Sequence, residues 1–139
     1  MNTIGSLRLG RARIAAGWCV GNFAQDMNGI PCLPDSPQAV RWCARGAVGS
    51  SFDSGLNTEA EEALYNALPS GFSEARIEGY GKGNAVAAFN NSGSREEVLA
   101  LFDRAIANLS RVKATPPDWN AIASKRTVGD DVLSQEVAA

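Results

Sequence analysis

The strongest constraint in this sequence is an apolar stripe at helical spacing in its second half. Apolar residues recur there at steps of three and four positions, at Val98, Leu101, Phe102, Ala105, Ile106, Leu109 and Val112. Such steps place side chains on one face of an α-helix, so the pattern predicts a helix with one buried face. Ser94-Arg95-Glu96-Glu97 has the spacing of a capping box and should begin this helix, which Pro116-Pro117 limits to about Lys113.

Two further segments carry helix signals. Thr58-Glu59-Ala60-Glu61 has the spacing of a second capping box, and an apolar stripe follows it at Ala60, Ala63, Leu64, Ala67 and Leu68. The helix dipole stabilises acidic side chains near a helix N-terminus, so the glutamates here are interpreted as helix starters and not as catalytic acids. Residues 6–16 predict another helix, with Ser6 as its cap and Gly17 ending it in a left-handed conformation.

Residues 35–50 predict a central helix around which the rest of the chain packs. Pro37 suits a first helical turn, and polar residues before it can cap the helix. The buried face would be small, at Val40, Cys43, Ala44 and Ala47, so another helix should cross it closely. Arg41 and Arg45 are expected in solvent. The adjacent Trp42-Cys43 allows a ligand pocket or a reactive thiol, but a core aromatic beside a buried thiol is the favoured interpretation.

The segments between these helices predict one hairpin and two irregular stretches. Asn28-Gly29 is a strong hairpin signal, because both residues tolerate positive φ, and residues 18–25 and 30–33 flank it as candidate strands. Gly79-Tyr80-Gly81-Lys82-Gly83-Asn84 has the wrong residue order for a phosphate-binding loop, so a flexible loop is expected there. Asn90-Asn91-Ser92-Gly93 predicts a turn.

Together these patterns predict one mainly α fold. It is a compact four-helix domain over residues 1–113, with a small β-hairpin after the first helix. The length of 139 residues fits a single domain. Residues 114–139 are more polar and are expected to form a C-terminal extension or docking tail, which Trp119 and Ile122 could anchor.

The residue types present exclude several chemistries. The chain contains no histidine, which rules out Ser-His-Asp and Cys-His nucleophilic catalysis and zinc sites that need an imidazole. Its three cysteines, Cys19, Cys32 and Cys43, form no closely spaced pair, so no metal site is predicted. No pair of carboxylates stands out and no cofactor is predicted. Whether the protein is an enzyme stays open, with the balance against it.

Charge and hydropathy indicate which partners and which cell compartment to expect for the protein. The net charge of −2 argues against nucleic-acid binding. Residues 1–50 carry five arginines and two aspartates, whereas the rest carries eight basic and thirteen acidic residues. This asymmetry favours attraction between two halves of one domain over a basic patch for an anionic ligand. No apolar run reaches the roughly 20 residues of a membrane helix, and no signal peptide is evident, so a cytoplasmic protein with reduced thiols and no membrane partner is expected.

Several segments together resemble a known family. They are Leu9–Ile14 with Gly17-Trp18, Ala39–Ala47, Phe89-Asn90-Asn91 and Glu97–Ile106. In order and spacing they resemble a family of small bacterial and phage proteins that is classed only as a domain of unknown function, over roughly residues 7–110. The family carries Trp-Asn-Asp where this chain has Phe89-Asn90-Asn91, which favours a structural role for this position. The resemblance implies no activity and no catalytic residues, and it supports a phage or mobile-element origin.

Two classes of function follow. The first is a small, soluble, non-enzymatic protein-interaction module, with a protein partner or self-association; a phage-encoded accessory or anti-defence protein would be one example. The second is a small-molecule-binding protein or enzyme, with a pocket lined by Trp18, Trp42, Tyr80, Lys82 and Asn90. The first class is preferred, because the sequence carries no catalytic constellation and its charge is unevenly distributed.

Overall fold

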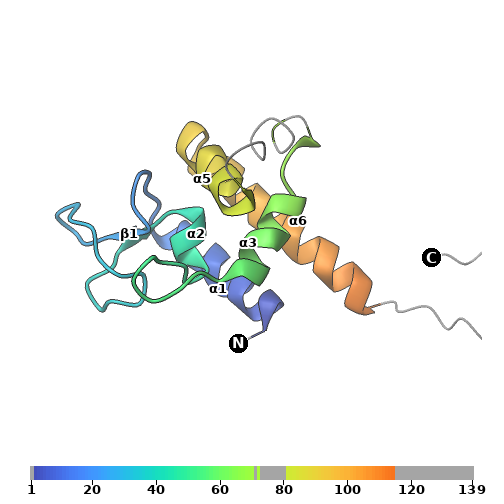
Figure 1. The fold of residues 1–139 in the computed structure, drawn as a ribbon, viewed down its shortest axis with the longest axis horizontal. Helices are drawn as coiled ribbons and strands as arrows, with labels where there is room; N and C mark the ends of the chain where they lie inside the picture. Colours follow the sequence, from blue (N-terminus) through green and yellow to red (C-terminus); the bar gives the residue numbers. More distant parts are fainter. Residues whose placement is uncertain (1, 71, 73–80, 115–139) are drawn as a thin grey trace, which may run out of the picture. The chain divides into compact units, whose positions relative to one another are not determined.

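The computed structural model describes residues 2–70, 72 and 81–114, and is mainly helical (Figure 1). These residues form five helices and two short strands: Thr3–Ala16 (α1), Ala24–Gln25 (β1), Arg41–Trp42 (β2), Ala44–Ala47 (α2), Thr58–Asn66 (α3), Lys82–Ser92 (α5) and Arg95–Ala114 (α6). The prediction of a mainly α chain with a small antiparallel sheet is confirmed, but the count of four helices is wrong. No helix in these ranges is long and apolar enough to cross a membrane.

Contacts divide the chain into two units, Met1–Leu109 and Ser110–Ala139. The first unit holds α1 to α5 and most of α6. The predicted anchors of the tail, Trp119 and Ile122, lie outside the described residues.

The core of the first unit is built from all five helices, with α2 contributing the small side chains Ala44 and Ala47. Its largest fully buried apolar side chains are Leu7 and Ile14 from α1, Leu64 from α3, Val86 from α5, and Val98, Leu101 and Phe102 from α6. Gly10 lets α1 approach α6 closely, because a Cβ at this position would lie 2.6 Å from the ring of Phe102. Four residues of the predicted apolar stripe are buried on α6, Val98, Leu101, Phe102 and Ala105, and Ile106 and Leu109 pack partly buried against the same core.

The start of α6 confirms the predicted capping box. The amide of Glu97 donates to Ser94 Oγ at 3.2 Å, and the amide of Ser94 donates to Glu97 Oε1 at 2.9 Å. Each side chain thus satisfies an amide that has no helical carbonyl as partner. The described part of the helix extends to Ala114, one residue beyond the predicted end.

The caps of α1 and α3 differ from the predictions. α1 begins three residues earlier than predicted, because the side chain of Asn2 accepts an amide of the first turn at 2.7 Å, and Ser6 is buried within the helix. α3 is capped by Asn57, whose side chain accepts a first-turn amide at 3.3 Å and donates to the Val48 carbonyl at 2.9 Å. Glu61, the predicted capping-box partner, is buried and pairs with Arg45.

The predicted helix over residues 35–50 is wrong over most of its length. Only Ala44–Ala47 is helical, and Arg41–Trp42 forms β2. Ser36 caps a turn and not a helix, with its Oγ accepting from the Gln38 amide at 3.0 Å. Turns and helix N-termini favour the same small polar residues, so the local sequence does not separate them; the pairing of β2 with other segments decides the outcome.

The small sheet also differs from the predicted hairpin. β1 pairs antiparallel with β2, with Ala24 opposite Trp42. The turn at Asn28-Gly29 is present, with Gly29 at φ 81°, but the segment after it contributes a single bridge, from Gln25 to Pro31. Because Pro31 has no amide to donate, this segment is a poor partner, and β1 takes its main partner from later in the chain.

Two glycines let this sheet region lie directly against the helices. Gly17 follows α1 with an extended φ of −171°, so the predicted left-handed end is wrong. A Cβ on Gly17 would lie 2.0 Å from the carbonyl oxygen of Val40, and a Cβ on Gly46 in α2 would lie 1.8 Å from that of Phe23. No other residue type fits at either position without moving the backbone.

α5 occupies residues that predict a loop and a turn. It runs from Lys82 to Ser92, and Ala85 and Val86 are fully buried. Near its C-terminal end, the ring of Phe89 packs edge to face on Phe72, with centroids 5.4 Å apart. Small and polar residues dominate this helix, so its apolar pattern is weak.

The loops that join α1 to α3 lie together on one side of α1 and α2 (Figure 1). They comprise residues 17–43, which contain the sheet, and residues 48–57. Residues of both loop segments line a hollow in the first unit.

Candidate functional site

A buried ion pair joins α2 to α3. Arg45 Nε lies 3.0 Å from Glu61 Oε2, and Arg45 Nη2 lies 3.4 Å from Glu61 Oε1. Only 8% of the Arg45 side chain and 5% of the Glu61 side chain are exposed. The prediction that Arg45 lies in solvent is therefore wrong. Each charge here depends on the other, because a single charge buried without its counter-ion is costly.

Aromatic rings and a glycine enclose this ion pair. A Cβ on Gly83 of α5 would lie 2.6 Å from Glu61 Oε1 and 2.8 Å from Arg45 Nη2, so the missing side chain makes room for both charges. Arg45 Cζ lies 5.4 Å from the ring centroid of Phe23 and 6.0 Å from that of Phe52. The two rings meet edge to face, with centroids 5.1 Å apart. The guanidinium of Arg45 therefore lies next to one carboxylate and two aromatic rings.

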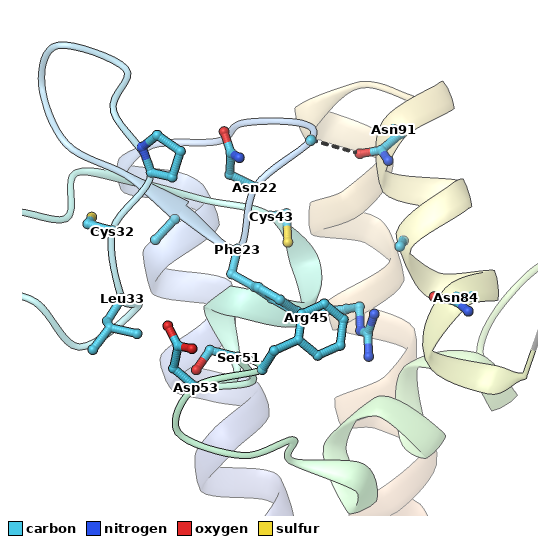
Figure 2. Close-up of a pocket in the computed structure, with 15 residues that line it drawn as sticks. Asn22, Phe23, Cys32, Leu33, Cys43, Arg45, Ser51, Asp53, Asn84 and Asn91 are labelled. Carbon is cyan, nitrogen blue, oxygen red and sulfur yellow. Dashed lines mark hydrogen bonds between the residues drawn. The ribbon is translucent and has the colours of Figure 1, made fainter.

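A hollow of about 670 Å³ opens beside the ion pair (Figure 2). This first hollow is lined by the loops before and after β1, the loop after α2, and one face of α5: Gly21, Asn22, Phe23, Ala24, Pro31, Cys32, Leu33, Cys43, Arg45, Ser51, Phe52, Asp53, Asn84, Ala87 and Asn91. Its lining combines apolar side chains, asparagine amides and two charged groups. Phe52 at its edge is 79% exposed.

A second hollow of about 490 Å³ shares Arg45, Phe52 and Asn84 with the first. Its other lining residues come from the α3 region and the first turn of α5: Leu56, Thr58, Glu61, Glu62, Lys82 and Gly83. Phe52 and Arg45 therefore line both hollows, whereas Glu61 lines only the second.

Asn90 lies fully buried near the end of α5 and connects three segments. Its Oδ1 accepts from Trp18 Nε1 at 2.9 Å and from the Ala44 amide at 3.0 Å. Its Nδ2 donates to the Cys19 carbonyl at 3.1 Å and to Asn91 Oδ1 at 3.3 Å. A side-chain amide offers two acceptor and two donor positions, so all four are used. Asn90 holds α5 against the start of α2 and against the chain that follows α1.

Comparison with known proteins identifies the family of this chain. A model of a family of unknown function, DUF6197, matches residues 3–108, from the start of α1 into α6. The chain belongs to DUF6197. No curated protein and no solved structure matches it. The DUF6197 region contains the ion pair, both hollows and Asn90, so these features lie in the part of the chain that defines the family.

Three of the residues predicted to line a pocket lie close together in this DUF6197 chain. Trp18 is hydrogen bonded to Asn90 and forms a backbone bridge with Trp42. Trp42 Nε1 donates to the Pro34 carbonyl at 2.9 Å. The polar atoms of these three side chains are therefore used inside the fold, and none of the three lines either hollow.

The other two predicted pocket residues belong to a different part of the chain. Lys82 begins α5, roughly 12 Å along the helix axis from Asn90. Its Nζ lies 3.1 Å from Glu62 Oε2, and it lines the second hollow. Tyr80 lies outside the described residues.

The three cysteines are free thiols, and each has a raised pKa. Burial, followed by the neighbouring Cys43, raises the pKa of Cys19 to about 12. Burial also raises the pKa of Cys43, and burial followed by the charge of Asp26 raises that of Cys32. Within the described ranges no three His, Cys, Asp or Glu side chains are grouped so that they could hold a metal ion.

The residues that shape this site carry weak sequence signals. Arg45 stands between small residues that all become buried, and this interruption of a small-residue run is the one local indication that it does not face solvent. Glu61 is indistinguishable from its acidic neighbours in a helix start. Phe52 lies in a loop rich in serine and glycine, where a large aromatic side chain is unusual.

Proposed function

We propose that this chain is a non-enzymatic protein-interaction module that binds its partner through the loops between α1 and α3. The observation that carries the proposal is the location of exposed apolar side chains. Among the described residues, every exposed large apolar side chain except that of Leu9 lies within residues 20–56. They are Val20, Met27, Ile30, Leu33, Val40, Phe52 and Leu56. We call these seven the apolar loop residues. Apolar side chains gathered on one region of a surface are typical of a protein-binding site.

Phe52 has the properties of an interface anchor. The residue is 79% exposed, and its ring makes the edge-to-face contact with Phe23. The loop that carries it is closed by two backbone hydrogen bonds between Ser51 and Gly55, at 2.9 and 3.0 Å. A pre-positioned aromatic side chain loses little conformational freedom on binding, and aromatic residues are enriched among those that dominate interface energies.

The polar groups beside these loops also fit a binding role better than catalysis. Arg45 is neutralised by Glu61, and the amide of Asn90 makes four internal hydrogen bonds. Burial keeps the thiol of Cys43 protonated by raising its pKa. A phage-encoded accessory or anti-defence role in the cytoplasm is the setting we propose for this module, on the strength of the sequence resemblance.

The first hollow favours a second candidate, a small-molecule-binding protein. Its volume of about 670 Å³ falls within the roughly 300–1,000 Å³ typical of ligand pockets. Native mass spectrometry of the protein purified gently from its host separates the two candidates. A bound mass of a few hundred daltons that is lost on denaturation supports the second.

Affinity purification from host lysate tests the interaction proposal directly. Three tagged forms of the full chain are compared: the natural sequence, Phe52→Ser and Leu9→Ser. Leu9 is an exposed apolar residue on α1 and serves as the matched control. We expect a stoichiometric partner, or a second copy, with the natural sequence and with Leu9→Ser, and a loss with Phe52→Ser. Recovery of a monomer alone in all three would contradict the proposal.

A further inference from the structure

We propose that the first hollow receives a basic side chain, an arginine or lysine, of the partner protein, and that Asp53 is the group that recognises its charge. This inference rests on the proposed interaction function and specifies the chemistry of the partner. It is based on the balance of charge in the hollow, the nature of its walls and the direction of the Asp53 side chain.

The hollow has one uncompensated charge. Arg45 and Asp53 are the two charged side chains among its lining residues. Arg45 is paired with Glu61 and 8% exposed, so its charge is neutralised within the protein. Asp53 is exposed, and none of the ion pairs found among the described residues includes it. An incoming ligand therefore meets a net negative charge, which favours a cation.

The walls of the hollow suit a cation on an apolar stem. Phe23, Leu33 and Phe52 supply apolar and aromatic surface to the hollow that Asp53 also lines. Figure 2 shows the carboxylate of Asp53 directed towards the space between Leu33 and Phe23. Lysine and arginine bury their methylene stems against apolar surface while the charged end stays polar, and aromatic faces attract such cations. A carboxylate ligand would face repulsion from Asp53 without gaining a free cation.

The chain itself shows that these rings accept a guanidinium. Arg45 Cζ lies within 6.0 Å of the ring centroids of both Phe23 and Phe52. The second hollow offers no comparable preference, because its charges are matched in the pairs Arg45–Glu61 and Lys82–Glu62. The inference is therefore specific to the first hollow.

Peptide titration of the full, isotope-labelled chain tests the inference by NMR. The probes are two peptides, acetyl-Gly-Leu-Arg-Leu-Gly-amide and the same sequence with glutamine in place of arginine. We expect saturable shifts in the amide signals of Phe23, Leu33 and Asp53, and about fivefold tighter binding of the arginine peptide, the upper range for an exposed ion pair. Asp53→Asn should remove the difference between the peptides, whereas the control Asp103→Asn on α6 should keep it.

The outcomes separate this inference from the proposed function. Equal binding of both peptides, shifts confined to other residues, or no binding would overturn the basic-side-chain inference. A partner that purifies with the natural sequence, needs Phe52 and binds Asp53→Asn as strongly would also overturn it, while leaving the interaction function intact. If no partner depends on Phe52, the proposed function itself fails. Loss of the arginine preference at high salt would support the inference, because salt screens an exposed pair.

Discussion

The guanidinium of Arg45 and the carboxylate of Glu61 form a two-point contact between α2 and α3, with closest atoms 3.0 Å apart and little of either side chain in water. Gly83 of α5 lies against the same two groups. Three helices therefore meet at one ion pair, whose Arg45 lines both hollows and whose Glu61 lines the second. This arrangement links the stability of the first unit to the shape of its proposed binding surface.

Glu61→Gln should destabilise the protein strongly. Glutamine preserves the shape of the side chain but leaves the guanidinium of Arg45 buried without a counter-charge, at a cost of about 3–5 kcal/mol in the free energy of unfolding. The control is Glu62→Gln, which breaks the exposed pair with Lys82 and should cost about 0–1 kcal/mol. Urea denaturation followed by circular dichroism measures both. Equal effects of the two substitutions would mean that the buried pair has no special role.

Gly83→Ala should destabilise through the ion pair and not through helix propensity. Alanine favours helices over glycine by about 1 kcal/mol, so a surface position would gain stability from this change. At Gly83 the new Cβ would lie 2.6 Å from Glu61 Oε1, and the pair must shift. We expect a net loss in urea denaturation, and a smaller loss in an Arg45→Met/Glu61→Leu background. A gain in stability from Gly83→Ala would show that the contact is loose.

The sequence predicts α6 well because its signals are local. The Ser94–Glu97 capping box and the apolar stripe lie within the helix itself, and the structure shows both. The sequence predicts α5 and α2 poorly. Their main contacts come from distant residues: Asn90 bonds to Trp18 across 72 positions and to Ala44 across 46.

The site is harder to predict than the fold for the same reason. Arg45 and Glu61 are 16 positions apart, and nothing in either local segment indicates their pairing. The predicted pocket residues Trp18, Trp42 and Asn90 do come together, since all three belong to one hydrogen-bonded region. The hollows lie elsewhere, because they form from loops whose course depends on the sheet and on Gly17 and Gly46.

Asn90→Ala should cost about 2–4 kcal/mol, because it leaves the Ala44 amide and the Cys19 carbonyl without their partner in a buried region. Asn90→Asp keeps the acceptor for Trp18 and Ala44 but loses both donors and buries a charge, so it should also destabilise. The control is Asn91→Ala, which removes weaker contacts of 3.3 Å at an exposed position and should cost less than half as much. Thermal and urea unfolding of the three variants check this order; a neutral Asn90→Ala would contradict it.

The raised pKa of Cys19 predicts a loss of stability at alkaline pH. The folded protein holds the Cys19 proton to a pKa of about 12, whereas the unfolded chain releases it near the ordinary value of 9.0. The unfolded state therefore binds fewer protons above pH 9, and the contribution of Cys19 to stability decreases from there through pH 12. The difference in unfolding free energy between the natural chain and Cys19→Ala should shrink over this range. A difference that is constant with pH would contradict the assignment.

The thiols should also differ in reactivity. Cys32 is partly exposed, whereas Cys19 and Cys43 are buried. We expect a thiol reagent at pH 8 to modify Cys32 first and the other two only on a timescale set by unfolding, as peptide mass spectrometry would show. Rapid modification of Cys43 in the folded protein would mean that the first hollow opens further than the structure shows.

Photo-crosslinking in the host shows whether Phe52 contacts a partner protein. A photoreactive phenylalanine analogue replaces Phe52 in one sample and Leu9 in another, and the adducts are resolved by mass after irradiation. We expect one discrete protein adduct, or a dimer of the chain, from position 52 and none at comparable yield from position 9. The same adducts from both positions, or no protein adduct from position 52, would contradict it.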